Sequence, residues 1–174
     1  MEIGEVFTDG FGRVREEVHA VLDGISQEDL DARPAPGANP VGWLVWHIAR
    51  VQDDHVAGAA GRAQTWTADG WHERFGLPLA PEDIGYGHTD EQVAQVSGVS
   101  AAELRAYYDA VHAATVDYVA GLAAADLDRI VDENWNPPVT LGVRLVSVVN
   151  DNQQHTGQAA YARGLLAADW RHAA

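Results

Sequence analysis

The sequence contains no cysteine, and all eleven of its basic residues are arginine. Without cysteine the chain can form no disulfide, catalytic thiolate or zinc-finger site, so any thiol chemistry needs a thiol supplied by another molecule. Without lysine, a Schiff-base mechanism and a phosphate-binding loop built on lysine are both excluded. The exclusive use of arginine, together with abundant Ala, Gly, Val and Asp, indicates a source genome rich in G and C.

Long apolar runs are absent as well. No window approaches the roughly 18 consecutive apolar residues that a transmembrane helix needs, so no such helix is expected. The N-terminal residues show no basic segment followed by an apolar stretch, so no signal peptide is expected and the cytoplasm is the predicted location.

Positive charge is scarce: the sequence has 26 acidic residues and 11 basic ones, which gives a formal net charge of −15. Such a surface repels phosphate backbones and anionic lipids, so neither nucleic acid nor a membrane is expected as a partner. The same field attracts cations, including metal ions. A simpler interpretation is that the acidity only keeps the protein in solution.

Hydrophobic periodicity predicts four helices, and no segment alternates convincingly as a strand. The first helix is expected over about residues 8–22 and the second over about residues 40–60, with Asn39 as its cap and Gly61 as its stop. A long connection follows, over about residues 62–99, in which a short helix is expected after Thr89. A connection of this length allows the second and third helices to run in the same direction.

The third helix is expected to begin at Ser100, which opens a capping box with Glu103. The fourth is expected over about residues 140–168, after the helix-breaking residues 136–138. The predicted fold is therefore all-α: one domain over residues 1–174, built as a four-helix bundle with a long crossover connection between helices 2 and 3.

The predicted fourth helix begins almost entirely apolar and turns abruptly polar at residues 150–158. Polar residues within a buried helix are costly unless they are paired or bind something. Asp151 and His155 lie four residues apart, hence on one face with Cβ atoms about 5–6 Å apart. A carboxylate oxygen and an imidazole nitrogen at this spacing can both reach one ion at about 2 Å.

His47 is the expected third ligand, because it lies among apolar residues where an imidazole needs a partner. His55 is the main rival, since it lies closer to the centre of the apolar face of the same helix. His19 and His112 are further candidates on the other two helices. The alternatives to a metal site are a hydrogen-bonded core histidine and a simple Asp–His ion pair within one helix.

Three stretches of the sequence carry a family resemblance: residues 39–50, 71–76 and 150–165. They resemble the DinB-like superfamily, more closely its mycothiol-dependent branch, which includes maleylpyruvate isomerase. In that superfamily a histidine of the second helix and two residues four apart on the last helix bind a divalent metal. The resemblance thus implies that His47, Asp151 and His155 are the metal ligands, and that they act in catalysis through the metal.

The resemblance implies a metal-dependent thiol S-transferase. A small-molecule thiol, mycothiol in an actinobacterium, would bind the metal as thiolate and attack an electrophile in a detoxification reaction. Zinc is the first expectation for the metal, with nickel and iron as alternatives, and a homodimer is left open. Two other functions also remain open. One is a non-haem-iron or other metal-dependent enzyme of unknown substrate, and the other a non-catalytic binding protein braced by its metal.

Several large side chains are candidates for the walls of a substrate pocket, although a place in the hydrophobic core is the more common role for each of them. Two arginines could meet an anionic group. The candidates are Trp43, Tyr107, Trp135, the segment from Trp66 to Trp71, Arg50 and Arg163.

Overall fold

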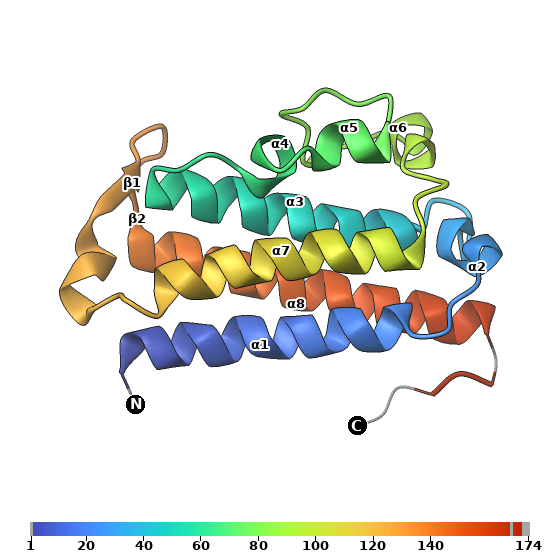
Figure 1. Cartoon of the computed structure of the whole chain (residues 1–174), viewed down its shortest axis with the longest axis horizontal. Coiled ribbons are helices and arrows are strands. Elements are labelled where there is room, and N and C mark those ends of the chain that lie inside the picture. Colours follow the sequence, from blue (N-terminus) through green and yellow to red (C-terminus); the bar gives the residue numbers. More distant parts are fainter. Residues whose placement is uncertain (1, 168, 172–174) are drawn as a thin grey trace.

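The computed structural model describes residues 2–167 and 169–171, and four long helices dominate it (Figure 1). These are α1 (Ile3–Leu22), α3 (Val41–Ala60), α7 (Ala101–Val119) and α8 (Leu141–Leu166). They lie side by side as a bundle, and each of α3 and α1 packs against both α7 and α8. The predicted all-α fold with a long crossover connection is confirmed.

Shorter elements fill the connections between the long helices. They are α2 (Gln27–Asp31), α4 (Thr65–Ala68), α5 (Trp71–Phe75), α6 (Asp90–Gln95), the 3-10 helix η1 (Ala124–Asp128), β1 (Ile130–Asp132) and β2 (Val139–Thr140). The helix expected after Thr89 is α6, and its predicted capping box is present. The expectation of no strand was wrong, because β1 and β2 pair as a small antiparallel hairpin. At three and two residues, these strands are too short to show an alternating pattern.

Side-chain contacts between the long helices show in which direction each helix runs relative to the others. Tyr107, near the start of α7, bonds Asp53 in the middle of α3, whereas Arg62, just beyond α3, reaches the carbonyl of Ala114 farther along α7. The second and third long helices therefore run parallel, as the length of the crossover predicted. Helix α8 runs antiparallel to α3, because His55 near the end of α3 contacts Arg144 near the start of α8.

Three helix ends differ from the predicted boundaries. Helix α1 begins at Ile3, earlier than expected, because the Glu5 carboxylate accepts the backbone N–H of Glu2 at 2.9 Å and closes an additional first turn. The cap of α3 is Pro40, and the helix begins at Val41, so Asn39 is not its cap. Helix α8 ends at Leu166, and the predicted last residue, Ala168, lies outside the described residues.

The crossover connection covers one face of the bundle. Helices α4, α5 and α6 lie over α3 and α7 in Figure 1. The connection contributes buried side chains to the same core as the long helices: Trp66, Leu77, Val93, Val96 and Val99. This packing explains why the long connection is ordered, since its apolar residues remove a large area from water. Among the described helices, none is long and apolar enough to cross a membrane.

Candidate metal centre

The structure brings the three predicted ligands together between α3 and α8. One potential ligand atom from each of His47, Asp151 and His155 lies within 4.8 Å of the others. The Oδ2 atom of Asp151 is 3.9 Å from Nε2 of His47 and 3.4 Å from Nδ1 of His155. Two donors that each bind one ion at about 2.1 Å are at most about 4.2 Å apart, and the distance between Oδ2 of Asp151 and Nε2 of His47 is within this limit.

The hydrogen bonds of the two imidazoles favour metal binding. Nδ1 of His47 lies 2.5 Å from the carbonyl oxygen of Ile84, and Nδ1 of His155 lies 2.8 Å from the carbonyl oxygen of Asp151. A carbonyl oxygen only accepts, so each Nδ1 carries the proton and each Nε2 keeps its lone pair. Metal-binding histidines are usually held in this way by their second nitrogen. Both rings therefore present Nε2 as the metal-binding atom.

Asp151 supplies the third donor and has spare capacity for it. Its Oδ2 is shielded from solvent and has no hydrogen-bond partner. A buried carboxylate oxygen without a partner is costly, and a bound cation would satisfy it. Burial alone raises the pKa of Asp151, but the nearby ring of His155, whose Nδ1 lies 3.4 Å from Oδ2, outweighs this and holds the pKa below its ordinary value. The carboxylate is thus ionised and ready to bind a cation.

The two imidazoles differ in their ease of protonation. Burial lowers the pKa of His47 to about 4, so its ring is neutral at physiological pH. Burial also lowers the pKa of His155, but the hydrogen bonds to Asp151 outweigh it and raise that pKa above the ordinary value. A metal ion must therefore compete with a proton mainly at His155.

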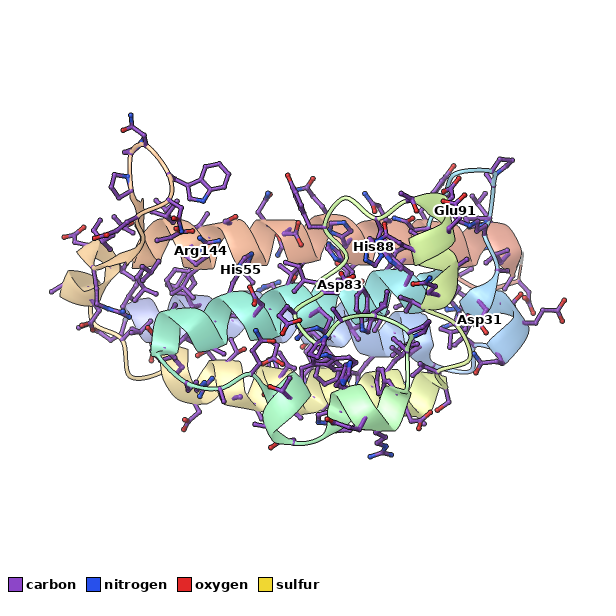
Figure 2. All side chains as sticks on the ribbon, turned by 90° about the horizontal axis from the view of Figure 1, so that it is seen from above. Asp31, His55, Asp83, His88, Glu91 and Arg144 are labelled. Carbon is purple, nitrogen blue, oxygen red and sulfur yellow. The ribbon has the colours of Figure 1, made fainter. Side chains whose placement is uncertain are left out.

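The rival histidines lie elsewhere. His55 pairs with Asp54 and contacts Arg144 near the opposite end of α3 (Figure 2). His19 binds Asp109 across the α1–α7 interface. His112, on α7, has a buried Nδ1 with no hydrogen-bond partner. Within the described residues, only the predicted set forms a group of three or more possible ligands. That His47, Asp151 and His155 bind a metal remains a prediction.

The aromatic candidates divide into three groups. Trp43 stacks on the His47 ring, with centroids 4.7 Å apart and an interplanar angle of 12°, and thereby walls the site. Trp66 and Tyr107 are buried core residues, and Trp71 packs against that core. Trp135 is 64% exposed on the β1–β2 connection.

Neither arginine candidate is available to an anionic group. Arg50 is completely buried, and its guanidinium donates to Tyr107 Oη, Gln64 Oε1 and the carbonyl oxygens of Pro81 and Asp83. Arg163 is also buried and donates to carbonyl oxygens at the end of α1 and just beyond it. Arg50 thus fastens the irregular backbone of residues 81–83 to the bundle, whereas Arg163 ties the end of α1 to α8.

Sequence reasoning missed the segment that holds His47. Residues 81–88 precede α6 and press against α3, and Asp83 and His88 lie on this segment (Figure 2). Gly85 approaches so closely that a Cβ atom there would be 2.8 Å from Nδ1 of His47 and 3.0 Å from Trp43. The segment has no periodicity, so only its glycines and its polar residues indicated that it packs closely against a helix.

Comparison with known proteins identifies one family and one similar crystal structure. The sequence profile of the DinB superfamily matches residues 11–159. A crystal structure of a conserved protein from Enterococcus faecalis is similar to this chain, with a TM-score of 0.90 and 32% sequence identity. The similarity covers 97% of this chain and 99% of that one. No curated protein matches.

Proposed function

Because this chain belongs to the DinB superfamily, we propose that it is a metal-dependent thiol S-transferase. Its thiol substrate is mycothiol, which it conjugates to electrophiles in detoxification, and its metal is zinc. Trp43, stacked on His47, and the loop of residues 81–88 shield one side of the centre.

The arrangement of donors carries this proposal. Two imidazole nitrogens and one carboxylate make three protein ligands, whereas closed structural zinc sites use four. At least one coordination position is left for a substrate or water, which is typical of a catalytic metal. Asp151 and His155 are partly accessible to solvent, so a small molecule can approach the centre from the α8 side.

The residues of the centre have different roles. The neutral ring of His47 and the ionised carboxylate of Asp151 bind and orient the cation. A metal ion held there would lower the pKa of a coordinated thiol and so would supply a thiolate at neutral pH. The thiol proton leaves to solvent, sulfur forms a bond to the electrophilic carbon, and the leaving group departs with the electrons of its bond. Since the chain has no cysteine, the nucleophilic sulfur must come from a second substrate.

A neighbouring cavity is suited to the electrophile. It has a volume of about 330 Å³ and includes Leu44, Gln158, Tyr161 and Ala162 in its lining. Leu44 lies one turn before His47, and Gln158 lies one turn after His155, so the cavity lies along the same two helices as the metal centre. No charged side chain lines it. The cavity therefore favours an uncharged, largely apolar electrophile.

A second candidate function rests on the same donors. Two histidines and one carboxylate also bind iron in non-haem oxygenases, so oxygen chemistry is the alternative for this centre. Elemental analysis of protein purified without oxygen separates the two functions, because bound zinc or nickel argues against oxygen chemistry. A third possibility, a metal that only braces the bundle, predicts a large loss of thermal stability when His47 is replaced.

The decisive experiment is a conjugation assay on the metal-loaded protein with mycothiol and a broad panel of uncharged electrophiles, followed by mass spectrometry of the thioether. The proposal expects turnover that is lost in His47→Ala while the fold is kept. His55→Ala, on the same helix but outside the centre, is the matched control and should remain active. Metal-loaded protein that forms no thioether with any electrophile would refute the proposal.

A further inference from the structure

A chain of hydrogen bonds links the loop of residues 81–88 to the helix that carries His47. Nε1 of Trp43 lies 3.1 Å from Nδ1 of His88, and Nε2 of His88 lies 2.8 Å from Oδ1 of Asp83. The same oxygen of Asp83 accepts the backbone N–H of Gly85 at 2.8 Å. The side chain of His88 is only 3% exposed, so water does not compete for these bonds.

The hydrogen-bond partners of His88 determine which of its two ring nitrogens carries the proton. The indole nitrogen of Trp43 can only donate, so Nδ1 of His88 must accept and carries no proton. The ring proton is therefore on Nε2, where it is donated to the carboxylate of Asp83. His88 can bridge Trp43 and Asp83 only in this tautomer, which makes it a specific connector and not simply a filler of space.

The loop is fastened at both ends, and His47 is bound in between. Arg50 donates to the carbonyl oxygens of Pro81 and Asp83 at 3.2 and 3.1 Å, which holds the beginning of the loop. His88 holds its end. The carbonyl group of Ile84, between these anchors, is thereby fixed 2.5 Å from Nδ1 of His47.

We propose that His88 is a positioning residue for the metal centre. By tying Trp43 to Asp83 it holds the Ile84 carbonyl group and the Trp43 ring against His47, which fixes the proton of His47 on Nδ1 and directs Nε2 toward the ligand position. Its importance for metal binding rests on the proposed function, but its control of the His47 ring is a property of the protein without metal.

The first test is long-range ¹H–¹⁵N NMR of the metal-free protein at about pH 8, where ordinary imidazoles are neutral. The parent protein should show His47 protonated at Nδ1 and His88 at Nε2. In His88→Phe, which keeps a ring but loses both nitrogens, His47 should become a mixture of tautomers. His72→Phe is the matched control in the same connection, because the His72 ring hydrogen-bonds the Leu79 carbonyl group and pairs with Glu73, away from the residues 81–88 that hold His47.

The second test is the dissociation constant for zinc, measured by competition with a chromophoric chelator. His88→Phe should bind zinc about 10–100-fold more weakly, the loss that is typical when the hydrogen bond that orients a metal-binding histidine is disturbed. His88→Gln, which keeps one acceptor and one donor, should recover part of this loss. A purely structural role would lower the thermal stability and leave the zinc affinity of the folded protein unchanged.

The results separate two failures. If the parent binds no divalent metal, the proposed function fails, and the tautomer of His47 alone then decides the role of His88. If His88→Phe leaves the His47 tautomer unchanged, the positioning role is overturned. An unchanged zinc affinity in that variant also overturns it. Should His88→Phe not fold, Gly85→Ala is the substitute, because the added Cβ pushes the same loop away from His47.

Discussion

Gln52 of α3 and Asn152 of α8 face each other in the centre of the bundle, with Nδ2 of Asn152 2.8 Å from Oε1 of Gln52. Two more bonds converge on Gln52: its Nε2 donates to Thr115 at 2.9 Å, and the hydroxyl of Tyr108 donates to its Oε1 at 3.2 Å. All four side chains are buried. One amide group therefore joins α3, α7 and α8, close to the candidate metal centre.

Replacement of Gln52 by leucine should destabilise the protein by about 3 kcal/mol, because it leaves several buried polar groups without their partner. The measurement is the free energy of unfolding from urea denaturation. Gln154→Leu is the control, since Gln154 is exposed on α8, and it should change this free energy by about 0.5 kcal/mol or less. A loss no larger than that of the control would mean that the junction contributes little.

The long helices were predictable because their signals are local. Apolar periodicity and capping residues such as Ser100 depend on a few neighbouring positions, and the structure uses Ser100 as a cap. The short helices α2, α4 and α5, at four or five residues each, carry too little periodicity to be found in this way. The junction of Gln52 with Asn152 depends on the register between two helices, which no local pattern specifies.

Replacement of Arg50 by methionine should loosen the crossover connection and cost about 3 kcal/mol or more, because methionine keeps the apolar length but leaves buried acceptors unpaired. Limited proteolysis is the direct measurement, with new cleavage expected within residues 62–99. Arg13→Met, which removes an exposed pair with Asp9, is the control and should leave the cleavage pattern unchanged. Protection equal to that of the parent would show that apolar packing alone holds the connection.

The parts of the candidate site that lie close together in the sequence could be predicted, and the contacts between distant segments could not. Asp151 and His155 lie one turn apart, so helix geometry alone placed them on one face. His47 comes from another helix, and it was preferred over His55 because of its apolar neighbours in the sequence, a choice that the family resemblance then supported. Nothing in the sequence indicated the bond from His47 to the Ile84 carbonyl or the link from His88 to Asp83, because both arise when an irregular loop packs on α3.

The stability of the protein should depend on pH through His112. Burial, chiefly, lowers the pKa of this histidine in the folded protein. The unfolded chain therefore binds a proton at His112 more readily, and the folded state loses stability as pH falls below about 6.5, the ordinary histidine pKa. His112→Phe should thus gain more stability over the parent at pH 5 than at pH 8. The same difference at both pH values would exclude this contribution.

Replacement of Asp151 by alanine should separate metal binding from folding. Its buried Oδ2 has no partner, so loss of the carboxylate should cost the metal-free protein little stability at pH 8. Zinc at about 100 times its dissociation constant should stabilise the parent by about 2.7 kcal/mol and the variant by much less. Thermal unfolding with and without zinc measures both effects. Asp117→Ala, an exposed acidic residue on α7, should respond to zinc like the parent.

The cavity beside the metal centre should select the electrophile by size. Ala162 lies two turns beyond His155 on the same stripe of α8, about 10 Å along the helix, so Ala162→Leu places new bulk where the far end of a substrate would lie. The KM for bulky uncharged electrophiles should rise about tenfold, within the range expected for a few methylene groups in an apolar pocket. Small electrophiles and zinc affinity should be unaffected.

Tyr161 offers a second test of the cavity that does not disturb the core. Its side chain is exposed at the cavity rim, so Tyr161→Ala should raise the same KM while the unfolding free energy stays unchanged. Ala113→Leu, on the exposed face of α7, is the control for added bulk. If bulky and small electrophiles respond equally to both cavity variants, the cavity does not bind the substrate, and the electrophile must approach the metal centre from the solvent side of Asp151. That outcome would leave the metal centre itself intact, because neither variant changes one of its three donors.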